Sequence, residues 1–341
     1  MAVAVREELK RRDPECKVLF VGTPEGLERK ILPPLGFSLR TIRIGALNKV
    51  SVRRVLKTLT QLPSSLMKAR EILKDFRPTV VISLGGYSAG PVVMVARIMG
   101  YPSVLVEPNA YPGLTNRLLG PLVRRAAVAF KETADFFPGK ARETGIPIRT
   151  QFHQILPWAA KGESVRLLVF GGSRGSRPIN RLMCDALSYL KDLDISVVHQ
   201  TGESDFNWVS DAYKRASVSG IIQKYIGDMP SEFESADIII SRSGASTVAE
   251  IGAAGRASIL IPFPAAANNH QWGNALALQQ SGAAILVKQS TLSGQVLAQK
   301  IMDLVREPCE IDRMAKASRV FAHRDSAARM VDLLEEVQKG D

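Results

Sequence analysis

The chain alternates short apolar runs with longer segments in which apolar residues recur every three or four positions. The runs are rich in β-branched residues and stay apolar throughout, which is typical of parallel strands covered on both faces. The intervening segments have the period of amphipathic helices. This alternation predicts doubly wound α/β sheets. Strands are expected at residues 17–22, 79–84, 103–107, 165–170, 195–200, 236–241 and 257–262.

The first residues depart from this order, because the chain opens within a helix. Residues 1–12 have the pattern of the back half of an amphipathic helix, Asp13-Pro14 ends it, and strand 17–22 follows. A fold of alternating strands and helices normally opens on a strand. The first residues therefore depart from the order that this class of fold predicts.

The pattern breaks near residues 145–164, where two prolines and a polar cluster replace any periodicity. A strand and a glycine turn restart directly afterwards. We therefore expect an N-terminal domain over 1–149, a linker over 150–164 and a C-terminal domain over 165–322. Residues 323–341 are predicted to form a C-terminal helix that packs back on the N-terminal domain.

Composition narrows the class of protein. The chain has 341 residues, 45% of them hydrophobic and 23% charged, as in a globular protein long enough for two domains. No apolar run reaches the length of a membrane span. Cys16, Cys184 and Cys309 lie far apart, which favours buried apolar side chains over catalytic thiols. The four histidines have no metal-ligand spacing, so no metal site is expected.

The net charge of +12 is concentrated in the first half of the chain. Residues 1–150 contain 25 Lys and Arg against 12 Asp and Glu, whereas the remainder has a net charge of −1. Between Arg29 and Arg70 there are ten basic residues and no acidic one. This asymmetry indicates a polyanionic partner for the N-terminal half.

One part of the basic stretch, residues 51–62, interleaves Arg53, Arg54 and Lys57 with apolar residues. That pattern suits a helix lying on an anionic bilayer, where each basic residue contributes about 1 kcal/mol. An ordinary helix with its apolar face in the core has the same pattern, and the missing acids favour the bilayer. Nucleic acid is disfavoured because the region lacks interleaved aromatics and matches no common nucleic-acid module.

Two glycine turns join a predicted strand to a predicted helix. Residues 85–90 follow strand 79–84, and residues 171–175 follow strand 165–170. Glycines permit close backbone approach, and the free amides of a helix start bind phosphate. Neither turn matches a dinucleotide fingerprint or a P-loop. Each is equally compatible with simple strand-to-helix geometry.

A third junction places hydroxyl side chains at residues 243–247, after strand 236–241. Such a helix start favours an anionic group by about 0.3–1 kcal/mol. Glu250 lies one turn further on, where its carboxylate can accept from both hydroxyls of a sugar diol or simply complement the helix dipole. The next loop suits either a sugar or solvent, and its polar residues are Asn268, Asn269, His270, Gln271 and Asn274.

Together these residues resemble the MurG family of bacterial peptidoglycan glycosyltransferases. The motifs are GGYSAGP (85–91), EPNAYPGLTNRLL (107–119), FGGSRGSRPIN (170–180), HQTG (199–202) and the segment 235–275. The resemblance covers nearly the whole chain in the expected order. It implies an α/β fold of GT-B type, with two Rossmann-like domains facing a cleft. It also implies inverting transfer of N-acetylglucosamine (GlcNAc) from UDP-GlcNAc to lipid I, giving lipid II.

The resemblance also implies roles for individual residues. Ser173 and the start of the helix after 236–241 are expected to contact the donor diphosphate, Ile226 the uracil and Glu250 the ribose. Glu107 is the candidate for acid–base or acceptor-positioning work, and no metal or other cofactor is implied. The acceptor diphosphate is expected at Gly85, Gly86, Tyr87 and Ser88. The implied donor-site residues are Asn109, Arg149, Ser173, Ile226, Ala245, Ser246, Thr247, Val248, Ala249, Glu250, His270 and Gln271.

The implied partners are UDP-GlcNAc, lipid I, the anionic inner membrane surface on its cytoplasmic face and other cell-wall synthesis proteins. The sequence departs from the family at Val106, where a histidine is frequent. The family's first strand and GGTGGH-type loop do not precede residues 1–12, which implies an N-terminal sheet with one edge unfilled. Two alternatives are another GT-B glycolipid glycosyltransferase and a non-catalytic nucleotide-sugar-binding fragment. The motifs in 85–91 and 107–119 favour transfer of GlcNAc to lipid I over the glycolipid glycosyltransferase.

Overall fold

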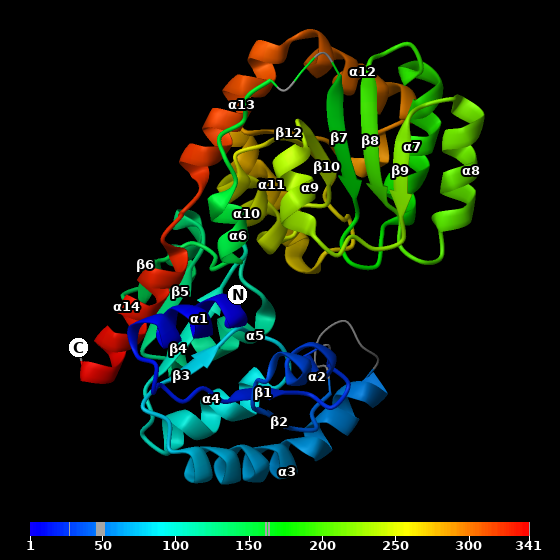
Figure 1. The fold of residues 1–341 in the computed structure, drawn as a ribbon. Coiled ribbons are helices and arrows are strands. Elements are labelled where there is room, and N and C mark those ends of the chain that lie inside the picture. Colours follow the sequence, from blue (N-terminus) through cyan, green and yellow to red (C-terminus); the bar gives the residue numbers. More distant parts are fainter. Residues whose placement is uncertain (27, 46–51, 161, 163, 341) are drawn as a thin grey trace. The chain divides into compact units, whose positions relative to one another are not determined.

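The computed structural model describes residues 1–26, 28–45, 52–160, 162 and 164–340, apart from the side chains of residues 31, 52–57 and 59. Contacts divide the chain into two compact units (Figure 1). Unit 1 comprises Met1–Pro147 and Asp325–Asp341, and unit 2 comprises Ile148–Arg324. Both units have parallel sheets flanked by helices, which confirms the predicted α/β class.

Unit 2 contains a six-stranded parallel sheet in the order β12-β11-β10-β7-β8-β9. The chain runs outward from β7 through β8 to β9, then returns to the other side of β7 and continues through β10 and β11 to β12. This reversal is the doubly wound arrangement that binds ligands outside the carboxyl ends of its central strands. The strands are β7 (Val165–Phe170), β8 (Ile195–Gln200), β9 (Gly220–Gln223), β10 (Ile238–Ser241), β11 (Ala257–Leu260) and β12 (Ala284–Leu286).

Helices cover both faces of this sheet, which explains the uniformly apolar strands. On one face Leu167 and Val169 pack against α7 and α12. On the other face the ring of Phe170 lies 5.8 Å from that of Phe233 in α9. The helices are α6 (Thr150–Gln154), α7 (Arg177–Leu190), α8 (Phe206–Ala216), α9 (Met229–Ser235), α10 (Ala245–Ala254), α11 (His270–Gln280), α12 (Gly294–Arg306) and α13 (Pro308–Phe321), with 3₁₀ turns at Ala267–Asn269 and Gln289–Thr291.

Unit 1 contains a two-stranded parallel sheet, β1-β2, and a four-stranded parallel sheet, β3-β4-β5-β6. One apolar cluster, which includes Ile42, Ile72 and Val81, joins them through α3 and α4. The strands are β1 (Phe20–Gly22), β2 (Leu39–Thr41), β3 (Val81–Ser83), β4 (Ser103–Glu107), β5 (Arg125–Val128) and β6 (Ala141–Glu143). The helices are α1 (Ala2–Arg12), α2 (Glu28–Ile31), α3 (Val52–Phe76), α4 (Ala89–Ile98) and α5 (Leu114–Leu119), with 3₁₀ turns at Pro33–Leu35, Gly120–Leu122 and Lys131–Phe136.

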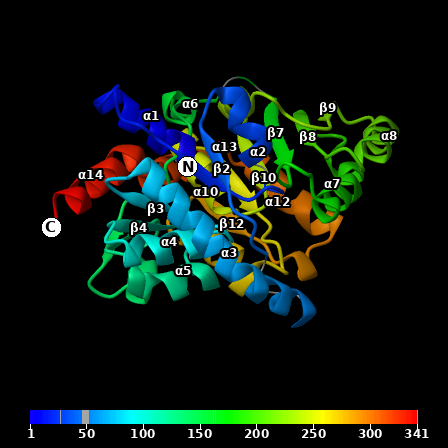
Figure 2. The same cartoon turned by 90° about the horizontal axis from the view of Figure 1, so that it is seen from below.

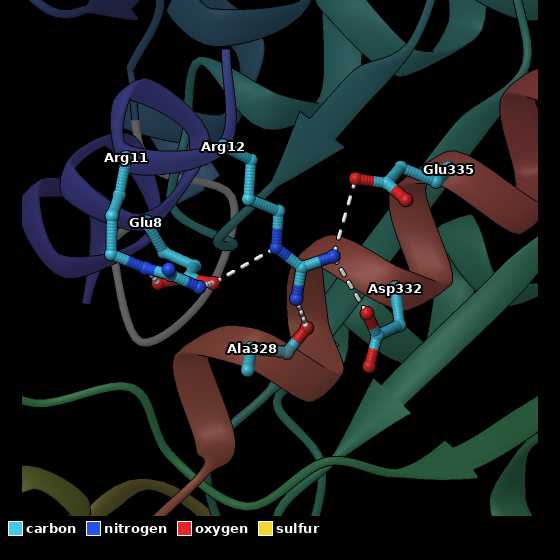
Figure 3. Close-up of polar contacts among 6 residues, drawn as sticks. All are labelled: Glu8, Arg11, Arg12, Ala328, Asp332 and Glu335. Atoms are coloured by element: carbon cyan, nitrogen blue, oxygen red, sulfur yellow. Dashed lines mark hydrogen bonds and ion pairs between the residues drawn. The ribbon is translucent and has the colours of Figure 1, made fainter. Parts of the chain in front are cut away.

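The helix α14 (Ser326–Lys339) completes unit 1 by packing beside α1 and on β4 and β5. Figure 3 shows the polar part of this contact, centred on Arg12. Its guanidinium donates to Glu8 at 2.9 Å, to Asp332 at 2.7 Å and to Glu335 at 3.2 Å. The carbonyl of Ala328 accepts a further bond at 3.1 Å. Segments from both ends of the chain are therefore part of one core.

The apolar pattern locates some strands better than others. The predicted strands 103–107, 165–170 and 195–200 coincide with β4, β7 and β8. The other four predicted runs are longer than β1, β3, β10 and β11, which they contain, and the pattern misses β2, β5, β6, β9 and β12.

The other two predicted segments are the linker and the basic stretch. The expected linker contains α6, whose Phe152 is fully buried with its ring 5.1 Å from that of Phe233, so this segment packs on unit 2. The interleaved basic side chains Arg53, Arg54 and Lys57 lie outside the described residues. No helix in the described part of the chain is long and apolar enough to cross a bilayer.

Candidate functional site

The strand reversal in unit 2 brings two turns together. Phe170 at the end of β7 pairs with Ser241 at the end of β10, so the segments that follow emerge side by side. Residues 171–175 form a glycine turn before α7, and residues 242–244 lead into α10. No side chain within the described ranges caps the amino end of either helix. Their free amides and dipoles favour an anion at this edge.

The glycine turn lies directly against the end of β8. Gly172 and Gly175 have φ of 99° and 74°, in the region that favours glycine. A Cβ at Gly175 would lie 1.9 Å from the carbonyl oxygen of Thr201, so no larger residue fits there. Ser173 is exposed at the tip of the turn. The structure thus places the predicted phosphate contact on a tightly fixed backbone.

The start of α10 presents some of the predicted residues and buries another. Ser246 is exposed, and Ala245 and Thr247 are half-buried, all within the first turn whose amides lack helical partners. Val248 differs, because its amide donates to Gly244 at 3.0 Å and its side chain is buried. Val248 therefore anchors the helix and offers the donor site neither its amide nor its side chain, whereas Ala249 is half-buried beside it.

Arg242 is a buried cation between these turns that the sequence pattern does not single out. Its guanidinium donates to the carbonyls of Ile261 and Pro262 at 2.9 and 3.0 Å and to the Ser176 hydroxyl at 2.9 Å. Burial lowers the pKa of Arg242 to about 10, and no carboxylate in the described part of the chain pairs with it. An uncompensated positive charge here favours an anionic ligand.

Glu250 lies one turn into α10 and faces Arg149, which precedes α6. The Arg149 Nη2 is 4.0 Å from Glu250 Oε1. Burial raises the pKa of Glu250 to about 7, and the Arg149 charge opposes this rise. The fold therefore brings together two predicted donor-site residues that lie far apart in the sequence.

The start of α11 is bonded to the start of α10. Ser243 donates its hydroxyl to the carbonyl of Gln271 at 2.7 Å. The Gln271 Oε1 accepts from the amide of Phe263 at 2.9 Å, which leaves its Nε2 as the group that can reach a ligand. His270 Nδ1 lies 2.6 Å from the carbonyl of Ala267 and must carry a hydrogen there, because a carbonyl only accepts. Its Nε2 is then the ring nitrogen that can reach a ligand.

Two further residues of the predicted donor region are buried. Asn274 has no exposed surface and donates to the Ser243 carbonyl at 3.2 Å, so the expectation that it faces a sugar or solvent is wrong. Ile226, in the loop after β9, is 4% exposed and lies at the same carboxyl edge of the sheet.

In unit 1 the carboxyl ends of β3 and β4 carry the predicted acceptor residues. Gly85 and Gly86 have φ of 82° and 83° and lead to Ser88 at the start of α4. Tyr87 is 53% exposed. The backbone therefore turns sharply at β3 and presents the aromatic ring outward.

Glu107, at the end of β4, is 1% exposed. Its Oε1 accepts from the amide and the side chain of Asn109, both at 3.0 Å. Its Oε2 accepts from the amide of Gly113 at 3.0 Å and from Asn116 Nδ2 at 2.8 Å. Both oxygens are thus engaged in holding the loop after β4, and Asn109 is held by this carboxylate.

A cavity of about 460 Å³ lies elsewhere in unit 1, beside the amino ends of β1 and β2. Its basic lining residues include Arg6, Lys17 and Arg40. Parallel α/β sheets bind ligands at the carboxyl ends of their strands, so this cavity is separate from both groups of residues described above.

Comparison with known proteins identifies both halves. Residues 1–128 match the glycosyltransferase family 28 N-terminal domain, and residues 166–330 match its C-terminal domain. The UDP-N-acetylglucosamine–N-acetylmuramyl-(pentapeptide) pyrophosphoryl-undecaprenol N-acetylglucosamine transferase of Solibacter usitatus is 42% identical over 99% of this chain and 92% of its own length. The equivalent protein of Syntrophus aciditrophicus is 42% identical over 97% and 92%. The crystal structure of Acinetobacter baumannii MurG superposes with a TM-score of 0.81 at 28% identity, covering 98% of this chain and 95% of that one.

Proposed function

The chain belongs to the MurG family of GT-B glycosyltransferases, and we propose that it transfers GlcNAc from UDP-GlcNAc to lipid I, forming lipid II for peptidoglycan. The observation that carries the substrate assignment is the strand reversal in unit 2. There a glycine turn, two helix amino ends and the buried charge of Arg242 converge on one edge. This edge suits the diphosphate of a nucleotide sugar.

The donor would lie along the carboxyl edge of unit 2. Its diphosphate would contact Ser173, Ser246 and Thr247, where the helix dipoles and Arg242 stabilise negative charge. Glu250 would accept from the ribose hydroxyls, and Ile226 would lie against uracil. The free amide nitrogen of Gln271 and Nε2 of His270 would meet the GlcNAc hydroxyls.

The reaction would be one inverting displacement at the anomeric carbon of GlcNAc. A hydroxyl oxygen of the acceptor sugar forms the new bond, the bond to the UDP oxygen breaks, and the hydroxyl proton passes to a base. The field of Arg242 and the helix ends would stabilise the leaving diphosphate. Glu107 would act by positioning, because both of its oxygens already hold the loop that carries Asn109. The acceptor diphosphate would lie at Gly85–Ser88.

The reaction is tested by UDP release from UDP-GlcNAc in the presence of a soluble lipid I analogue. We expect release only when this acceptor is present, with formation of a disaccharide product. Release with diacylglycerol in its place would instead support a glycolipid glycosyltransferase. Binding of UDP-GlcNAc without transfer to either acceptor would contradict the proposed activity and support a binding fragment.

The acceptor lipid requires the protein to reach a membrane, and the surface over α3, α4 and α5 has suitable chemistry. These helices lie side by side in unit 1 (Figure 2). Met67, Ile98 and Leu118 are 74%, 80% and 64% exposed. Basic residues adjoin each of them along the chain, namely Lys68, Arg97 and Arg117. We propose peripheral docking of this surface on the anionic cytoplasmic leaflet.

Binding to vesicles containing about 30% anionic lipid is expected to fall as sodium chloride rises from about 50 to 500 mM, because salt screens the basic residues. Cosedimentation with the vesicles measures the bound fraction of the protein. Ile98→Ser is expected to weaken binding about tenfold or more, since burying an apolar side chain of this size contributes about 1.5–3 kcal/mol. The matched control is Val320→Ser, which removes a residue 87% exposed in unit 2. Equal losses for both variants, or salt-independent binding, would contradict this docking surface.

A further inference from the structure

The HQTG motif at residues 199–202 has no role in the mechanism above, yet it lies beneath the glycine turn. Gln200 ends β8, beside Phe170 at the end of β7, and is 1% exposed. Its Nε2 donates to the carbonyl of Gly172 at 3.1 Å and towards that of Ser173 at 3.4 Å. One buried amide therefore holds two successive carbonyls of the turn.

This contact determines where the turn's amides point. In a planar trans peptide the C=O and the following N–H point in opposite directions. The carbonyls of Gly172 and Ser173 point at Gln200. The amides that follow them, those of Ser173 and Arg174, therefore point away from Gln200. The Gly172 carbonyl also accepts from the amide of Gly175 at 2.8 Å, which closes the turn. Successive amides pointing outward form an anion-binding concavity.

A second buried layer fixes the backbone that follows Gln200. Asn180 Nδ2 donates to the carbonyl of Thr201 and to Asp205, both at 2.9 Å, so its Oδ1 is an acceptor. His199 Nε2 lies 3.1 Å from that Oδ1 and must carry the proton, while Nδ1 accepts from the Tyr213 hydroxyl at 3.1 Å. Burial lowers the pKa of His199 to about 3, consistent with this neutral ring.

The two layers are joined through glycine backbone. A Cβ at Gly202 would lie 2.2 Å from the carbonyl oxygen of Arg174, and one at Gly175 would lie 1.9 Å from that of Thr201. The two segments are thus in contact without side chains between them. Any shift of Thr201 and Gly202 must move the end of the glycine turn.

We propose that Gln200 is a positioning residue for the donor diphosphate, supported by the His199–Asn180 pair. It acts by directing the amides of Ser173 and Arg174 outward and by keeping the neighbouring carbonyls away from the phosphates. This role rests on the proposed function, because it assumes a nucleoside diphosphate at that edge. It predicts a defect specific to phosphate and not to the nucleoside.

The test compares binding of UDP and of uridine by calorimetric titration of the full chain. Gln200→Leu replaces the buried amide by an apolar side chain of similar volume and so removes the hydrogen-bond donor. We expect UDP binding to weaken about tenfold, while uridine binding changes less than about twofold. The matched control is Gln223→Leu, at the paired position on the neighbouring strand β9, which should leave both affinities unchanged. Thermal unfolding of each variant checks folding.

The second layer gives an independent comparison. His199→Leu is expected to weaken UDP binding more than uridine binding. His199→Gln is expected to restore it, because a glutamine amide can donate to Asn180 and accept from Tyr213. Equal losses of UDP and uridine, or unchanged UDP binding in Gln200→Leu, would overturn the positioning role alone. Absence of UDP binding by the unmodified protein would overturn the proposed function and this role together.

Discussion

Replacing Arg256 by methionine is expected to lower the free energy of unfolding of unit 2 by about 3–5 kcal/mol. Arg256 is 1% exposed and donates to the carbonyls of Phe233 and Glu234, both at 2.9 Å. It also donates to those of Ala254 and Gly255, at 2.7 and 3.0 Å. These carbonyls belong to the carboxyl ends of α9 and α10.

The expected loss is large because methionine fills the volume but donates nothing. The freed carbonyls would remain buried, and each unsatisfied group costs about 1–3 kcal/mol. The positive charge also complements the negative ends of two helices. A second arginine, Arg319, donates to the carbonyl of Ile155, so the neighbouring segment retains part of its support.

Urea unfolding followed by tryptophan fluorescence measures this effect in unit 2, because Trp158, Trp208 and Trp272 all lie there. The control is Arg166→Met. Arg166 reaches the same helix α9 through Glu232 at 2.8 Å, but its side chain is 33% exposed, so a loss below about 1 kcal/mol is expected. Similar losses for both variants would show that Arg256 contributes no more than an ordinary surface arginine.

The fold could be predicted where burial leaves a signature in the sequence. Strands β7 and β8 lie at the centre of the sheet in unit 2, and their uniformly apolar runs give correct bounds. Strands β9, β12 and β6 lie at sheet edges, where one side is unpaired and polar or small residues are tolerated. Strand β5 is mostly buried but reads RAAV, and alanine carries no strand signal.

The site could be predicted only where it is local in sequence. The glycine turn 171–175 and the start of α10 are contiguous, so their chemistry can be read from neighbouring residues. Arg242 bonds Ser176, 66 positions away, and Gln200 bonds Gly172, 28 positions away. These partners meet only through the pairing of β10 and β8 with β7. A basic residue between an apolar strand and a glycine was the available signal for Arg242.

Binding of UDP-GlcNAc is expected to weaken about tenfold when the pH falls from about 8 to 6, because Glu250 loses its charge in this range. Burial raises the pKa of Glu250 to about 7 in the free protein, and the nearby Arg149 charge opposes the rise. A raised pKa means that the carboxyl is protonated below pH 7 and charged above it. The charged form offers both oxygens as acceptors to the ribose hydroxyls, whereas protonation removes the charge and turns one oxygen into a donor. Tight binding at lower pH must therefore release this proton.

The ligand for this measurement is UDP-GlcNAc and not UDP. The diphosphate of UDP-GlcNAc is esterified at both ends, so it does not titrate near neutrality. Glu250→Gln is expected to bind UDP-GlcNAc about 10–100-fold more weakly at pH 8, because it loses a hydrogen bond to a charged group. Its affinity should no longer change between about pH 6 and 8. The difference from the unmodified protein should therefore shrink as the pH falls.

A matched carboxylate separates this effect from general titration of the surface. The Glu203 side chain is 80% exposed and pairs with Lys224 at 2.6 Å. It follows β8, whereas α10 follows β10 on the other side of β7, so Glu203→Gln should retain the pH dependence of the unmodified protein. Arg149→Met should raise the pKa of Glu250 further, because it removes the charge that opposes protonation. The midpoint of the affinity curve should then move to higher pH. A curve in the unmodified protein that is flat from about pH 6 to 8 would remove Glu250 from the ribose contact.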